Sequence, residues 1–323
     1  ALTNARECVA RLWEVSSRRE LLQLTGHRFR IESMAFSPDG HLVFTVSAES
    51  AKIWEVSSGR LVWEVSKNRR QFWQWGEDDS IICATFSPDG QFALISEGKT
   101  THLWEISSGV LQQLRFHRSS VSCIAFSPDG QLLFVGSANG TARLWEVSSG
   151  GLRELEGYTG WIKSVVFSPD GRLVLTDSFS SVKAWEVSSG RLVWEVNYQG
   201  QTDPSHAMFS PDGQRVLADY GGTIRFWEAE SGRKLPKLNC TGTVNGISFS
   251  PDGRLAAIYT QEGRVYFCRA QEPDLGKPLG IYVAAYEVGA VYWQQNNHLV
   301  LADKGGPMGR PHFYQVALEG RWE

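Results

Sequence analysis

Histidines and cysteines are the first residues to test for chemistry, because they supply most metal ligands and many nucleophiles. The seven histidines show no His-Glu-x-x-His spacing, and the five cysteines form no Cys-x-x-Cys pair. They are His27, His41, His102, His117, His206, His298 and His312, and Cys8, Cys83, Cys123, Cys240 and Cys268. Glu97-Gly98-Lys99-Thr100 resembles the end of a phosphate-binding loop, but Ala93 stands where that loop needs glycine. The sequence therefore predicts no catalytic residue, no metal site and no cofactor.

A run of aromatic and charged residues at 68–79 is the strongest candidate for a binding site. Three aromatic rings there have arginines on one side and acids on the other, which resembles an interface hot spot with a polar rim. Aromatic residues recur near 158–161 and at 198. The predicted partner-binding residues are Arg70, Phe72, Trp73, Trp75, Tyr158, Trp161 and Tyr198. The alternative is that these rings cover the protein's own surface.

The elements that position these residues repeat along the chain. The pentapeptide Phe-Ser-Pro-Asp-Gly occurs six times, and a divergent copy stands at 293–297. The copies begin at residues 36, 86, 126, 167, 209 and 249. Proline presets one backbone angle of a turn, Asp can bond its own backbone, and Gly accepts the positive φ that closes a hairpin. A period of about 40–45 residues with flanking strands predicts a propeller array.

Each repeat has the pattern of four strands. The first ends at the Phe of the turn, and the second is an apolar run directly after the Gly, as in Leu132–Val135. The third ends in Trp-Glu, as at Trp54 and Trp145, and a Ser-Ser-Gly turn follows. The fourth alternates apolar and charged residues, which suits an outer edge strand. The 68–79 segment joins a fourth strand to the next first strand.

These motifs resemble the WD40 repeat family over essentially the whole chain, and the regular copies are similar to those of bacterial members. Gly26-His27 matches the family's Gly-His, and Trp-Glu replaces its Trp-Asp. The resemblance implies a hydrogen-bonded set of His, Ser or Thr, Trp and a turn Asp. Because Glu49-Ser50 stands where one such Asp is expected, we expect the set to be altered in most repeats. The resemblance also implies that partners bind the face carrying the connections between repeats.

The sequence predicts an all-β, WD40-like β-propeller of four-stranded antiparallel blades in a single domain, 1–323. Seven copies of the turn between first and second strands, counting the divergent one, favour seven blades. Eight third strands leave eight blades as the alternative. With seven blades, the N-terminal strands of 1–24 would close the ring with the last blade at about 284–323. Arg19–Leu24 is suited to that pairing, which would leave the strand around Val9–Trp13 in surplus.

The composition limits the classes of partner and the location that we expect. The net charge is −3 and the pI about 6.2, with no basic block, which argues against nucleic acid. No apolar run reaches the length of a membrane span, which argues against a membrane partner. Unpaired cysteines are typical of a reducing compartment, so we expect a cytoplasmic location.

Three functions remain open from the sequence. The first is a non-catalytic protein-interaction scaffold, and the second is a sensor module within a longer signalling or regulatory protein, where the partners would include its other domains. The alternative is a propeller that binds or hydrolyses a small ligand in its central channel. The residues expected there, such as Glu32, Lys163 and His206, are mixed and offer no adjacent carboxylate pair.

Overall fold

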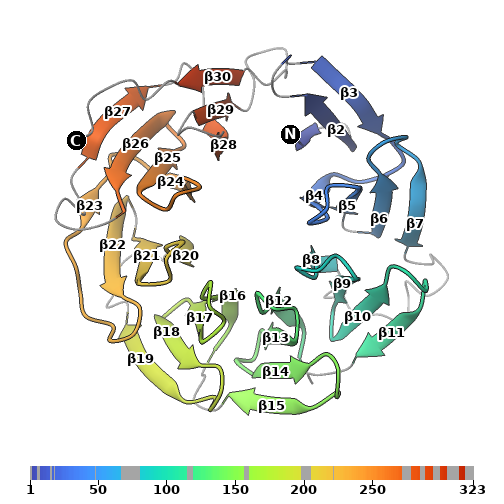
Figure 1. The fold of residues 1–323 in the computed structure, drawn as a ribbon, viewed down its shortest axis with the longest axis horizontal. Helices are drawn as coiled ribbons and strands as arrows, with labels where there is room; N and C mark the ends of the chain where they lie inside the picture. Colours follow the sequence, from blue (N-terminus) through green and yellow to red (C-terminus); the bar gives the residue numbers. More distant parts are fainter. Residues whose placement is uncertain are drawn as a thin grey trace. The chain divides into compact units, whose positions relative to one another are not determined.

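The strands of the computed structural model pair into eight antiparallel sheets, six of four strands and two of three (Figure 1). The residues described are 2–5, 8–14, 17, 19–47, 49–66, 81–114, 119–155, 160–197, 205–220, 222–270, 278–283, 288–293, 299–303 and 313–316. The chain divides into two compact units, Ala1–Phe167 and Ser168–Glu323. The all-β class and the four-stranded antiparallel repeat are confirmed.

The first unit contains four sheets and the strand that follows them. The three-stranded sheet is β1 (Leu2–Ala5), β2 (Val9–Glu14) and β3 (Arg19–Leu24). The four-stranded sheets are β4 (Ile31–Phe36), β5 (Leu42–Ser47), β6 (Ser50–Glu55) and β7 (Leu61–Ser66); β8 (Ile81–Phe86), β9 (Phe92–Glu97), β10 (Thr100–Glu105) and β11 (Leu111–Leu114); and β12 (Val121–Phe126), β13 (Leu132–Ser137), β14 (Ala142–Glu146) and β15 (Leu152–Leu155). The last strand is β16 (Ile162–Phe167).

The second unit begins with β17 (Leu173–Ser178), β18 (Ser181–Glu186) and β19 (Leu192–Asn197). Two four-stranded sheets follow: β20 (Ser205–Phe209), β21 (Arg215–Asp219), β22 (Thr223–Glu228) and β23 (Leu238–Asn239); then β24 (Val244–Phe249), β25 (Leu255–Thr260), β26 (Arg264–Arg269) and β27 (Pro278–Val283). The last sheet is β28 (Val288–Trp293), β29 (Leu299–Asp303) and β30 (Phe313–Val316).

Within the ranges given above, the structure contains eight sheets. This number agrees with the alternative of eight rather than with the favoured seven. The reason is the N-terminal segment, where β3 pairs with β2 in the register Ala10↔Leu24, so β2 is not a surplus strand. The sheet β1-β2-β3 lacks the counterpart of a first strand. Closure of 1–24 against 284–323, and a single ring over 1–323, stay predictions.

The Ser-Pro-Asp-Gly turn is a hydrogen-bonded cap between first and second strands. In the third copy, Ser127 Oγ donates to Asp129 Oδ1 at 2.5 Å and accepts from Leu132 N at 2.9 Å. Gly130 takes a φ of +71° and its N–H donates to Ser127 O at 2.9 Å. The hydroxyl donor of Ser127 lowers the pKa of the Asp129 carboxyl. The buried serine side chain therefore connects the strand to the turn.

Replacing Ser127 by Ala should lower the free energy of unfolding by about 1 kcal/mol, since the Leu132 amide and the Asp129 carboxylate both lose a partner. Chemical denaturation measures the change. Ser148→Ala is the matched control, because Ser148 is exposed, and we expect a change below about 0.5 kcal/mol there. Equal effects of the two substitutions would contradict this role of Ser127.

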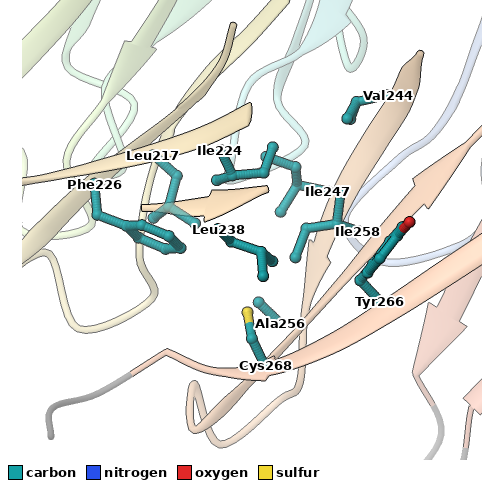
Figure 2. Packing of buried hydrophobic residues seen from close by; sticks show 10 residues of the cluster. All are labelled: Leu217, Ile224, Phe226, Leu238, Val244, Ile247, Ala256, Ile258, Tyr266 and Cys268. Atoms are coloured by element: carbon teal, nitrogen blue, oxygen red, sulfur yellow. The ribbon is translucent and has the colours of Figure 1, made fainter. Parts of the chain in front are cut away.

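Successive sheets bury their faces against each other. In the second unit, Leu217, Ile224, Phe226 and Leu238 of one sheet pack on residues of the next sheet, as Figure 2 shows. Those residues are Val244, Ile247, Ala256, Ile258, Tyr266 and Cys268. Cys268, which replaces the third-strand Trp, has no solvent exposure (0 %), so its thiol fills core space. The core therefore lies between the sheets rather than within any one of them.

The Ser-Pro-Asp-Gly turns of successive sheets lie next to each other along one edge of each unit. A Cβ at Gly90 would lie 3.6 Å from Pro38 Cδ, and one at Gly130 would lie 3.8 Å from Pro88 Cδ. In the second unit a Cβ at Gly213 would lie 3.4 Å from Pro169 Cδ. First strands also contact in order, β4 with β8 and β8 with β12. Within each unit this is the side-by-side arrangement that the repeat predicts.

Candidate interaction surface

The connections between repeats and the turns between second and third strands share one side of the first unit. Val121 N, at the end of a connection, donates to Gly98 O of such a turn at 2.7 Å, and Ala138 N donates to Ser120 O at 2.9 Å. We call this the connection side: described residues 25–30, 119–120 and 160–161 of the connections, and 49, 98–99 and 138–140 of the turns. The opposite ends of the strands carry the other turns, where Val56 N donates to His41 O at 2.9 Å.

His27 forms hydrogen bonds between one of these connections and the β4–β7 sheet. Its Nε2 lies 2.7 Å from Thr45 Oγ1, and its Nδ1 lies 3.0 Å from Ser47 Oγ and 2.9 Å from Ser50 Oγ. Trp54 Nε1 donates to Thr45 Oγ1 at 2.8 Å, so the set extends to the third strand. Two serines occupy the role that the resemblance assigns to an Asp. The hydrogen-bonded set therefore forms in this repeat in an altered version.

Burial controls the charge of His27, whose side chain is 7 % exposed. Desolvation, together with the nearby Lys52 ammonium, lowers the pKa of His27 from 6.5 to about 4, although Glu64 acts in the opposite direction. The imidazole is therefore neutral at neutral pH. A neutral ring can accept at one nitrogen and donate at the other, which suits a structural role.

Part of the same set recurs in another repeat. Trp185 Nε1 donates to Thr176 Oγ1 at 2.8 Å, as Trp54 does to Thr45. Thr176 Oγ1 is also 3.4 Å from Lys183 O. The Trp–Thr bond is thus common to the β4–β7 sheet and to β17 and β18.

Cation–carboxylate pairs join third and fourth strands, and the sequence reasoning missed them. Lys52 Nζ lies 2.6 Å from Glu64 Oε1, and Arg143 donates to Glu154 Oε2 at 2.8 Å. Lys52 is buried, although a lysine in a strand usually predicts an exposed position. The signal is a basic residue two positions before the Trp, opposite a Glu of the fourth strand. These pairs occupy structural positions rather than a reaction site.

Of the seven predicted partner-binding residues, the structure describes only Trp161. Arg70, Phe72, Trp73, Trp75, Tyr158 and Tyr198 lie outside the described residues. Trp161 is 50 % exposed on the connection side, directly before the buried Ile162. Phe29, which the sequence reasoning missed, is 42 % exposed in the connection from β3 to β4. Both rings come from connections of the kind that the resemblance assigns to partner binding.

Two absences hold for the described part of the chain. It contains no group of three or more His, Cys, Asp or Glu side chains placed to hold a metal ion. It also contains no helix that is both long enough and apolar enough to cross a bilayer.

Comparison with known proteins defines the class. The crystal structure of the computationally designed Ika8 protein matches 98 % of this chain and 92 % of its own, with a TM-score of 0.76 and 20 % identity. At that identity the likeness shows the fold alone. A search of curated proteins found no match. Together with the antiparallel sheets, the structural match defines an all-β protein of propeller architecture.

Within this class, two segments of the chain are similar to WD40 repeats. The family model described as "WD domain, G-beta repeat" matches residues 18–55 and 108–146. A second model, described as "Outer membrane protein assembly factor BamB", matches residues 137–270. The first match includes His27, Thr45 and Trp54, so the hydrogen-bonded set described above lies within a segment that is similar to that repeat.

Proposed function

We propose that this protein is a non-catalytic scaffold or sensor that binds other proteins through its connection side. WD domains commonly serve as interaction scaffolds, and two segments of the chain match that repeat. The observation that carries the proposal is the exposure of Trp161, a large aromatic side chain in a connection between repeats. We further propose a cytoplasmic location and a place within a larger signalling or regulatory protein.

Trp161 is presented by a firmly packed base. The next residue, Ile162, has no exposed surface (0 %), and its carbonyl accepts a hydrogen bond from Ser122 Oγ at 2.5 Å. A fixed backbone lowers the entropy that the indole ring must lose on binding. Tryptophan is also among the residues most enriched at interface hot spots. The remaining predicted residues, Arg70, Phe72, Trp73, Trp75, Tyr158 and Tyr198, belong to this proposal as predictions.

Trp161→Ala should reduce partner recovery about tenfold in affinity purification from the native cells, with a change in unfolding free energy below about 1 kcal/mol. The matched control is Val110→Ala, because Val110 is 57 % exposed but lies beside the edge strand β11. Quantitative mass spectrometry of the recovered proteins and chemical denaturation are the two measurements. The double variant Trp73→Ala/Trp75→Ala tests the 68–79 segment in the same way.

Unchanged recovery with both the Trp161 and the Trp73/Trp75 variants would overturn the proposal for this surface. The size of the native gene product, measured by immunoblot, tests separately whether the protein is part of a larger one. A product no larger than 36.1 kDa would remove that part of the proposal.

A further inference from the structure

Figure 1 shows the connection from β3 to β4. Three consecutive residues of this connection, Arg28, Phe29 and Arg30, are exposed, and we call them the Arg28–Arg30 loop. Phe29 is 42 % exposed, and both arginines are exposed. The residues on either side are buried, since His27 is 7 % exposed and Ile31 is 0 % exposed. A short segment thus leaves the core and returns to it, with one aromatic and two cationic side chains at its tip.

The base of this loop is rigid. His27 contacts Ser47, Ser50 and Thr45 at 2.7–3.0 Å, so the residue before Arg28 cannot move without breaking three hydrogen bonds. Gly26 has a φ of +134°, a conformation that residues with a side chain rarely adopt, and a Cβ there would lie 3.7 Å from Trp54 Cη2. A loop held at both ends presents its side chains in one arrangement, which lowers the entropic cost of binding.

The charges of the loop are available for a partner. Within the described residues, neither Arg28 nor Arg30 forms an ion pair, whereas Arg11, Arg143 and Arg233 each pair with a glutamate. Lys52, a buried cation of the sheet that follows the loop, is already paired with Glu64 at 2.6 Å. Among the described residues, the two exposed guanidiniums therefore have no carboxylate partner, in a protein whose net charge is −3. Their natural complement is a pair of carboxylates.

We infer that the Arg28–Arg30 loop binds an acidic segment of a partner protein. The inference rests on the proposed function and names the chemistry of the partner. Carboxylates accept hydrogen bonds from the two guanidiniums, and an apolar side chain between them packs on the Phe29 ring. Arginine forms bidentate bonds with carboxylates, so the two cations also set the line along which the bound segment lies.

A nucleic acid is the less favoured partner. Its backbone requires a row of cations, and binding that depends on phosphate contacts uses several of them. Two arginines on a protein with a pI of about 6.2 supply little of that field. The spacing of one aromatic between two arginines fits alternating acidic and apolar residues better than it fits a phosphate backbone.

Selection of random 12-residue peptides by phage display on the purified protein tests the inference. We expect the selected peptides to be enriched in Asp and Glu beside a large apolar residue. A fluorescein-labelled copy of the most enriched peptide should bind about tenfold more weakly to Arg28→Ala/Arg30→Ala, and more weakly as salt increases. The control, Arg60→Ala/Arg191→Ala, removes the same charge from turns at the opposite ends of the strands and should bind normally.

Phe29→Ala supplies a second readout, because it should weaken the same peptide while leaving the salt dependence unchanged. Selected peptides without acidic enrichment, no selected peptides, or equal binding to both double-arginine variants would overturn the inference. Binding of a 20-nucleotide single strand that depends on Arg28 and Arg30 would also overturn it. If the inference fails while Trp161→Ala still reduces partner recovery about tenfold, the proposed function stands without it.

Discussion

Gly232→Ala is expected to lower the free energy of unfolding by about 3 kcal/mol, more than any other single change considered for this protein. Two costs add. Gly232 has a φ of +68°, a conformation that costs a residue with a Cβ about 1 kcal/mol. The new Cβ would also lie 2.6 Å from Trp194 Cγ and 2.9 Å from Trp194 Cβ, which is overpacking against atoms close to the backbone.

Trp194 cannot move aside easily. Its side chain is 8 % exposed, and its Nε1 donates to Ala229 O of the same turn at 2.7 Å. Gly109→Ala is the matched control, because Gly109 occupies the same turn position with a φ of +71° and has no atom within 4 Å of its Cβ position. We expect about 1 kcal/mol there, measured by chemical denaturation. Similar losses for both variants would show that Trp194 does not restrict this turn.

The second large effect is a dependence of stability on pH that passes through His27. The folded-state pKa of about 4 lies below the ordinary 6.5, so the unfolded chain takes up a proton first as pH falls. The contribution of His27 is fully present above about pH 6.5 and is lost as pH falls toward 4. We expect about 2 kcal/mol of stability to disappear between pH 7 and pH 4.5.

Comparison of the parent protein with His27→Gln isolates this term, because the difference between their unfolding free energies should shrink over that window. His41→Gln is the control, since His41 is exposed beside a turn, and it should follow the pH curve of the parent. Parallel curves for the parent and the His27 variant would show that His27 does not govern the loss.

The features that the sequence predicted correctly are local ones. The Ser-Pro-Asp-Gly turn depends on four adjacent residues, so its presence could be inferred from their types alone, and the Ser127–Asp129 bond confirms it. The burial of Cys268 was also predictable, because it stands at the position of the third-strand Trp. These features do not depend on how distant segments meet.

The features that the sequence did not predict depend on partners far along the chain. Ser47 and Ser50 replace an acidic residue only because His27, about twenty residues earlier, lies between them. Lys52 is buried because Glu64 of the next strand supplies a carboxylate. The pairing of β3 with β2, which requires only a local hairpin, was missed in the favoured count. Closure of 1–24 against 284–323 stays a prediction.

The role of the candidate surface stays a prediction. The structure shows only that Trp161 is exposed, which a partner-binding residue requires. Phe29 was missed because a single aromatic among polar residues gives the same pattern whether it is buried or exposed. The arginines on either side of it supply the signal that distinguishes the two, and only the structure shows that all three side chains are exposed.

The placement of the core between sheets has a consequence for how such a chain can lengthen. One sheet supplies Leu217, Ile224 and Phe226, and its successor supplies Ile247 and Ile258 on the facing side. Duplication of a complete unit of about 40 residues delivers both complementary faces at once, whereas duplication of a single hairpin delivers neither. Growth by whole units accounts for the near-identical copies along the sequence. Later substitutions can then accumulate in the connections, while the apolar faces of neighbouring sheets stay complementary.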